Sequence, residues 1–104
     1  MTLKMILDAL NAAGIPAYEL KAPERANSYV VGHSFAPRTL NGDDCSLVRI
    51  DRVQLDIVWP ESSPGFYDRV CNVLDKLWQI YETEVYGYDD DFRAMRAILQ
   101  MEVV

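Results

Sequence analysis

The sequence has little of the chemistry from which enzyme active sites and metal centres are usually built. It contains one histidine, His33, and two cysteines, Cys45 and Cys71, and it has no glycine-rich phosphate loop, paired CxxC or HExxH spacing. A catalytic triad would have to combine His33 with one of the cysteines, and such an enzyme is one alternative. We favour His33 as a strand residue on a sheet surface and the cysteines as small apolar fillers. We therefore predict that the protein is not an enzyme and needs no cofactor or metal.

Basic residues are also scarce. The chain has 10 Lys and Arg against 16 Asp and Glu, a net charge of -6, and its cations are scattered singly. Binding to nucleic acid through phosphates requires clustered cations that release counterions, and an acidic surface opposes such binding. We therefore predict no direct nucleic-acid binding. The alternative is a basic patch that forms only in an oligomer.

The chain lacks the features of a secreted or membrane protein. Two cysteines do not make a disulfide framework, and reduced thiols are expected. The N-terminus has no basic start followed by an apolar run, and no apolar stretch approaches the ~20 residues that span a bilayer. We expect no membrane partner and a protein made and used in the cytoplasm, or in an assembly built there.

What the sequence does contain is enough apolar material for one core. Half of its 104 residues are hydrophobic and a quarter are charged. A chain of this size and composition can bury a core without disulfides or metal. We predict a single domain spanning residues 1–104.

The stretch from Leu47 to Trp59 is predicted to be the central strand. Its second half, Val53–Trp59, alternates apolar and polar residues, as a half-buried strand does. Its first half alternates in the opposite phase, so one extra residue is needed to keep the apolar side chains on one face. We predict a bulge near Asp51 and Arg52, which would divide a core half from an outer half that reaches toward a neighbour.

Two segments have the apolar spacing of amphipathic helices. The first begins at Leu3, with Thr2 as its N-cap and Gly14 as its left-handed end. The second follows Pro60, with a serine cap and Pro64 at its first position. Its apolar positions are Phe66, Val70, Val73, Leu74, Leu77 and Tyr81.

The remaining strands are predicted from β-branched and aromatic runs. They cover residues 15–20 at a sheet edge, 28–35, 83–86 and 95–103, and Gly32 marks a weak point or a close approach of backbone. The polar stretch from Ala36 to Asp44 is predicted to be a long mobile hairpin tip. The fold class is thus α+β, a mainly antiparallel sheet of four to five strands with two helices packed on one face, in the order α-β-β-β-α-β-β.

Acidic residues and tyrosines gather late in the chain. Between Lys76 and Arg93 every charged residue is acidic, and Tyr81, Tyr86 and Tyr88 are interleaved with them. The segment is either a recognition surface or a set of tyrosines packed over the sheet edge with solvated acids. Neither Asp43–Asp44 nor Asp89–Asp91 has the spacing of a calcium loop, which favours solvated turns.

Four segments together carry a family resemblance. They are Gly14–Tyr18 after the first helix, Ser28–Val31, Val53–Trp59 before the second helix, and Arg96–Glu102 at the end. The chain resembles, over nearly its whole length, the small tail-completion or tail-terminator proteins of long-tailed bacteriophages and prophages, often labelled minor capsid or minor tail proteins. Many relatives have a plain polar turn where this chain has the acidic segment from Tyr86 to Asp91.

The resemblance implies a structural virion protein at the head–tail interface, assembled in the bacterial cytoplasm. Such a protein forms a homo-oligomeric ring, commonly six-fold, stops polymerisation of the tail tube, and joins the tail to the head connector or stopper protein. An edge strand at 15–20, or the final strand, is a candidate for pairing across subunits. The competing hypothesis is a small cytosolic protein-binding or regulatory module.

Loops often carry contacts to partners, so candidate interaction residues are taken from the predicted hairpin tip and from the acidic tyrosine segment. They are Pro37, Arg38, Asn41, Asp43, Asp44, Tyr86, Tyr88, Asp89, Asp90 and Asp91.

Overall fold

The computed structural model describes residues 2–23, 26–41, 46–77 and 79–103, with side chains except at 36–41 and 46–51. The fold is α+β, with two helices and a five-stranded, mixed but mainly antiparallel sheet. The sheet order is β1-β2-β3-β5-β4, and only the β1–β2 pair is parallel. The elements are α1 (Leu3–Ala12), β1 (Ala17–Glu19), β2 (Tyr29–Asn41), β3 (Ser46–Trp59), α2 (Phe66–Lys76), β4 (Tyr81–Asp89) and β5 (Ala94–Val103).

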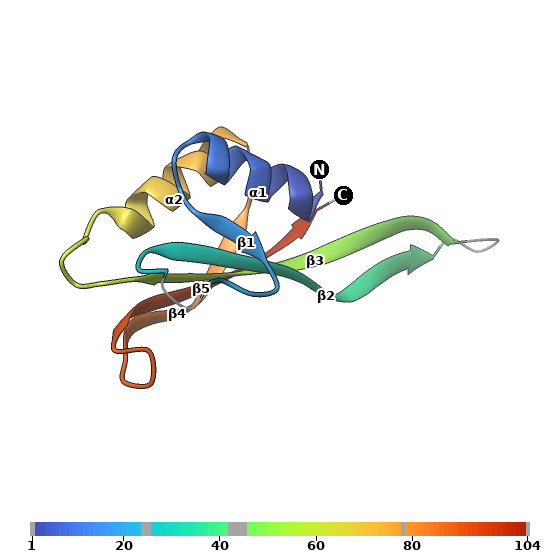
Figure 1. The fold of residues 1–104 in the computed structure, drawn as a ribbon. Helices are drawn as coiled ribbons and strands as arrows, with labels where there is room; N and C mark the ends of the chain where they lie inside the picture. The colour runs from blue at the N-terminus through green and yellow to red at the C-terminus, as the bar shows by residue number, and fades with distance from the viewer. Residues whose placement is uncertain (1, 24–25, 42–45, 78, 104) are drawn as a thin grey trace.

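Both helices cover the same face of the sheet, as predicted (Figure 1). We call this the helix face and the opposite side the open face. The strand predicted to be central, β3, does lie in the middle of the sheet, between β2 and β5. Alternate residues of β3 and β5 meet the apolar stripes of the helices in one cluster. Its buried members include Leu3, Ile6, Leu7 and Leu10 of α1, Phe66, Val70 and Leu74 of α2, Val53, Leu55, Ile57 and Trp59 of β3, and Ala97, Leu99, Met101 and Val103 of β5.

The predicted boundaries of α1 are confirmed. The Thr2 hydroxyl accepts a hydrogen bond from the Met5 N–H at 3.2 Å, which satisfies one of the free donors at the helix start. Gly14 follows the helix with φ +81°, a conformation that glycine adopts without steric cost. The Asn11 side chain then binds the backbone N–H and C=O of Ala17, at 3.0 and 3.1 Å, and so ties the helix end to β1.

The predicted start of α2 is wrong in detail. Gly65, not a serine, occupies the N-cap position and makes no side-chain cap, so Pro64 lies one residue before the helix cap. The Ser63 carbonyl accepts the Phe66 N–H at 3.2 Å, which is a turn that leads into the helix. Tyr81, predicted on the helix, instead begins β4 and still packs against the core.

The predicted hairpin tip at 36–44 is too long. Strand β2 continues to Asn41, and its ladder with β3 runs from Arg38–Ile50 to Asn41–Ser46. Asp43 and Asp44 lie outside the described residues. The polar composition misled the prediction, because Pro37 falls in the register shift between Phe35 and Arg38, where no ladder hydrogen bond from its nitrogen is needed.

The predicted bulge exists at the predicted level but on the other strand. Between Phe35–Arg52 and Arg38–Ile50, β2 advances three residues while β3 advances two, so the extra residue belongs to β2. On its other side β3 stays in register with β5 up to the pair Asp51–Val103. The prediction of an extra residue in β3 is therefore wrong, because a bulge shifts the alternation of the strand that carries it, which here is β2.

Beyond that last pair, β2 is the only strand among the described residues that pairs with β3. We call this two-stranded segment, formed by Arg38–Asn41 and Ser46–Ile50, the arm. It projects from the sheet and gives the molecule its length, with principal extents of 54 × 27 × 22 Å (Figure 1). The division of β3 into a core half and an outer half is therefore confirmed.

Gly32 lies where α1 approaches the backbone of β2 closely, which is one of the two roles predicted for it. A Cβ at this position would lie 2.8 Å from Leu3 Cδ1 and 3.1 Å from side-chain atoms of both Leu7 and Leu55. The missing side chain is what allows α1 to lie this close to β2.

We expect Gly32→Ala to lower the free energy of unfolding by about 1–3 kcal/mol, because the added methyl group overpacks the contact between α1 and the sheet. Gly65→Ala is the matched control, since a Cβ there would meet no atom within 4 Å. Urea unfolding of both variants measures the difference. Equal stability of G32A and the wild type would contradict this account of the helix–sheet contact.

Candidate protein-interaction site

The predicted interaction residues fall into two groups that the fold holds apart. Pro37, Arg38 and Asn41 lie on β2, at or within the arm, where only their backbone is described. The tyrosines and Asp89 lie on β4, and Asp90 and Asp91 lie in the turn that follows it. Figure 1 places the arm and this turn at opposite ends of the molecule.

Strand β4 is the outermost strand on its side of the sheet. It spans Tyr81–Asp89, which is longer than the predicted 83–86, and most of its side chains are exposed. Val85 is 45% exposed, Tyr86 58% and Tyr88 53%, and these are large apolar surfaces for an edge strand. In the described part of the chain, no strand pairs with its outer edge.

Tyr86 is presented on a rigid support. Its ring centroid lies 5.8 Å from that of Trp59 and 5.1 Å from that of Tyr67, the latter edge-on. Tyr67 in turn stacks on the buried Trp59 and shares a hydrogen bond with the Thr83 hydroxyl at 3.0 Å. Tyr86 thus packs over the sheet edge, as one of the two interpretations has it, and still exposes more than half of its surface; the recognition surface stays a prediction.

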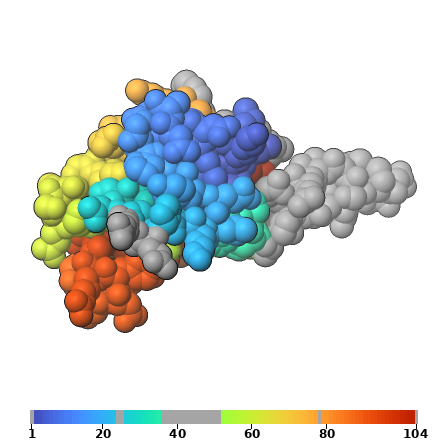
Figure 2. All heavy atoms as spheres, in the orientation of Figure 1, coloured from blue at the N-terminus to red at the C-terminus, as the bar shows by residue number. Residues whose placement is uncertain are grey.

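The turn after β4 is ordered by Asp89. Its Oδ1 accepts the N–H groups of Asp91 at 2.9 Å and Phe92 at 3.2 Å, and its Oδ2 accepts Arg96 Nη1 at 3.2 Å. The N–H of Phe92, together with Arg96 and the N–H of Asp91, lowers the pKa of Asp89 below its ordinary value. This end of the β4–β5 hairpin protrudes from the body as the orange lobe in Figure 2.

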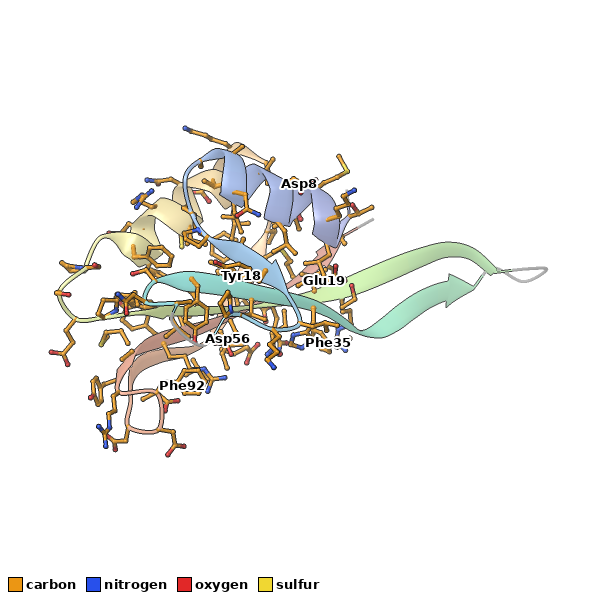
Figure 3. All side chains as sticks on the ribbon, in the orientation of Figure 1. Asp8, Tyr18, Glu19, Phe35, Asp56 and Phe92 are labelled. Carbon is orange, nitrogen blue, oxygen red and sulfur yellow. The ribbon has the colours of Figure 1, made fainter. Side chains whose placement is uncertain are left out.

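Arg96 connects this turn to the central strand. Its Nε and Nη2 bind both carboxylate oxygens of Asp56, at 2.9 and 2.6 Å, in a bidentate pair on the open face. Its guanidinium also lies 4.6 Å from the centre of the Phe92 ring. Figure 3 shows Asp56 and Phe92 on the side of the sheet away from the helices. Arg96 thus fixes the position of the lobe relative to β3.

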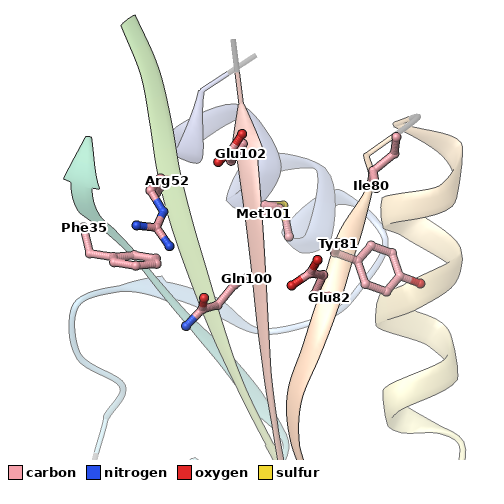
Figure 4. A pocket seen from close by; sticks show the side chains of 8 residues that line it. All are labelled: Phe35, Arg52, Ile80, Tyr81, Glu82, Gln100, Met101 and Glu102. Carbon is pink, nitrogen blue, oxygen red and sulfur yellow. The ribbon is translucent and has the colours of Figure 1, made fainter. Parts of the chain in front are cut away.

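A groove of about 480 Å³ lies at the base of the arm, where β3, β5 and β4 run side by side (Figure 4). On one side Arg52 lies over the Phe35 ring, 4.8 Å from its centre. Glu82 projects from β4 on the other side, and Ile80, at its rim, is 88% exposed. The lining mixes apolar and charged groups.

The pair of His33 and Cys71, one of the two that the enzyme alternative allows, is not assembled. His33 lies on the open face, near Phe35, whereas Cys71 belongs to α2 on the helix face, so the sheet separates them. The Cys71 thiol forms a hydrogen bond with Tyr81, and this bond is the largest cause of the raised pKa of Tyr81. Burial of the Tyr81 hydroxyl is the next largest cause. Cys45 lies outside the described residues. Among the residues that are described, no three His, Cys, Asp or Glu side chains come together in a group that could hold a metal ion.

No protein-family model matches the chain, and no curated protein matches it at a significant level. Neither of the two described helices, of 10 and 11 residues, is long and apolar enough to cross a membrane.

Sequence reasoning missed several residues of these surfaces. It did not find Val85 or Ile80, the Phe35–Arg52 pair, or the link from Arg96 to Asp56. The alternation of β3 and β5 does place Asp56 and Arg96 on the open face, but their meeting depends on the β3–β5 register, which single-strand patterns do not reveal. The final strand, predicted as a possible edge, is internal, because β5 pairs with both β3 and β4.

Arg96→Lys should destabilise the protein by about 1–2 kcal/mol, because an ammonium group cannot reproduce the bidentate pair with Asp56. Arg69→Lys, an exposed residue of α2, is the control and should stay within about 0.5 kcal/mol of the wild type. Thermal and urea unfolding measure both. An R96K chain as stable as R69K would show that the Arg96 contacts contribute nothing measurable.

The lowered pKa of Asp89 gives a second, pH-dependent prediction. A carboxylate whose pKa is lower in the folded state contributes stability above its unfolded-state pKa, and this is lost as the pH falls through the folded-state pKa. Asp89→Asn should therefore be less stable than the wild type at neutral pH, and the difference should shrink below about pH 4. Unfolding measured across this range tests it, with Asp90→Asn as the matched control. A difference that is constant with pH would contradict it.

Proposed function

We propose that the protein is a structural component of a long-tailed phage or prophage, a tail-completion or tail-terminator protein that acts as a homo-oligomeric ring at the end of the tail tube. In this role it would stop growth of the tube and join the tail to the head connector. It would be assembled in the bacterial cytoplasm and function in the virion.

The observation that carries the proposal is the projecting arm. The arm leaves the sheet beyond Asp51, where the pairing of β3 with β5 ends. Such an extension is expensive in conformational entropy unless it is ordered against something else. A contact with another protein is the simplest function for a segment that projects from the sheet in this way (Figure 1).

The position of the two candidate surfaces supports a ring. The arm and the acidic lobe lie at opposite ends of the molecule, so one copy can offer its arm while it receives another copy elsewhere. Contacts between different surfaces of identical subunits are heterologous, and they close into rings when the rotation between neighbours allows it. The arrangement of the surfaces therefore fits self-assembly into a ring.

The groove favours a second candidate function, a small protein-binding module. Its aromatic, apolar and charged lining would accept a peptide segment of a partner without any assembly into rings. A stable monomer that captures a host protein would favour this second function.

Sedimentation velocity and negative-stain electron microscopy of the full chain test the proposed role. We expect closed rings at high micromolar concentration, or rings that form when tail-tube protein from the same phage genome is added. The end of a tube should strengthen the contacts between ring subunits because it holds several of them side by side. If only monomer is present at high micromolar concentration, and added tube and connector proteins neither bind nor assemble it, the proposal is wrong.

A further inference from the structure

The outer edge of β4 restricts the kind of strand that can pair with it. The sequence of β4, YETEVYGYD, contains three acids and no base. Glu82 and Glu84 are exposed, and neither has an ion-pair partner within the part of the chain that the structure describes. If two copies paired through β4 alone, their carboxylates would face one another, and like charges across a strand pair are destabilising. A basic or neutral strand fits this edge better.

The chain itself carries a strand of that kind. The outer part of β3, Ser46–Ile50 or SLVRI, has one arginine, no acid and three large apolar residues. Its partner in the arm, Arg38–Asn41, likewise has one arginine and no acid. By contrast β1, at the other edge of the sheet, has only three residues and includes Glu19.

The geometry also permits the pairing. Beyond Asp51–Val103 the β5 side of β3 has no partner strand in the described structure, so its backbone groups face outward there. Five residues of extended chain cover about 16 Å, and the nine residues of β4, which include an irregularity between Thr83 and Val85, cover at most about 30 Å. An edge of that length can accept the arm, and a projecting arm can reach it without displacing the core.

We propose that Ser46–Ile50 of one copy pairs, as an added strand, with the outer edge of β4 in the next copy. The pairing brings the arginines of the arm, Arg38 and Arg49, to an edge that carries Glu82 and Glu84. This pairing rests on the proposed function in one respect, namely that copies of the chain assemble with one another. It adds which two surfaces meet.

A charge exchange between the two surfaces tests it in the full chain. The double variant Arg38→Glu with Arg49→Glu reverses the charge of the arm. The double variant Glu82→Lys with Glu84→Lys reverses the charge of the β4 edge. Each double variant alone should assemble at least about tenfold more weakly than the wild type, because like charges then meet at every contact. An equimolar mixture should regain assembly, since each arm then meets an edge of opposite charge. Sedimentation velocity over a range of concentrations measures all three.

Matched controls separate this effect from net charge and from misfolding. The two control variants make the same charge changes at exposed positions outside both surfaces, and they should assemble as the wild type does. They are Lys4→Glu with Lys76→Glu, and Glu19→Lys with Glu61→Lys. Far-ultraviolet circular dichroism and thermal unfolding show that each chain is folded. If a double variant does not fold, R49E and E84K are compared in the same way, with an expected weakening of about threefold.

The outcomes distinguish the two proposals. Rings from either double variant alone, as readily as from the wild type, or no recovery in the mixture, would overturn the arm–edge pairing and leave the ring function standing. If E82K/E84K alone loses assembly and R38E/R49E does not, β4 contacts a surface other than the arm. A wild-type chain that is monomeric under all conditions overturns both proposals.

Discussion

The burial of one face of β3 under two helices is the constraint on which the rest of the structure depends. Val53, Leu55, Ile57 and Trp59 alternate onto the helix face, and each is almost completely buried there. Each such side chain contributes roughly 1.5–3 kcal/mol, so the helices are committed to this face and cannot also cover the other. The arm extends beyond both helices and the open face is turned away from them (Figure 1), whereas β4 meets α2 through the contacts of Tyr67 with Thr83 and Tyr86.

The fold class and the element order could be predicted because they follow from periodicity. The helix spacing from Leu3, the alternation of Val53–Trp59 and the alternation of Met95–Val103 each specify an element and its buried side. Pairing between strands is a different matter. Which strand takes the extra residue opposite Asp51, and where the hairpin between β2 and β3 turns, depend on register, and composition alone suggested a loop where the ladder continues.

The candidate interaction surfaces were predicted only in part for the same reason. The acidic tyrosine segment was found because its composition is unusual, and the structure shows it at an exposed edge. What makes it a rigid surface is tertiary contact, in which Tyr86 packs on Trp59 and Tyr67, and Arg96 holds the turn against Asp56. Residues that meet across 40 positions of sequence leave no local signal. The arm is likewise visible only when the end of the β3–β5 ladder is known.

Hydrogen–deuterium exchange of the full chain at low and high concentration tests whether the arm and the β4 edge meet when the chain assembles. We expect amides in Ser46–Ile50 and in Tyr81–Asp89 to gain protection together as the chain assembles, while those of Ala17–Glu19 do not change. Assembly without added protection in either of the first two segments, or with protection gained at β1 instead, would contradict it.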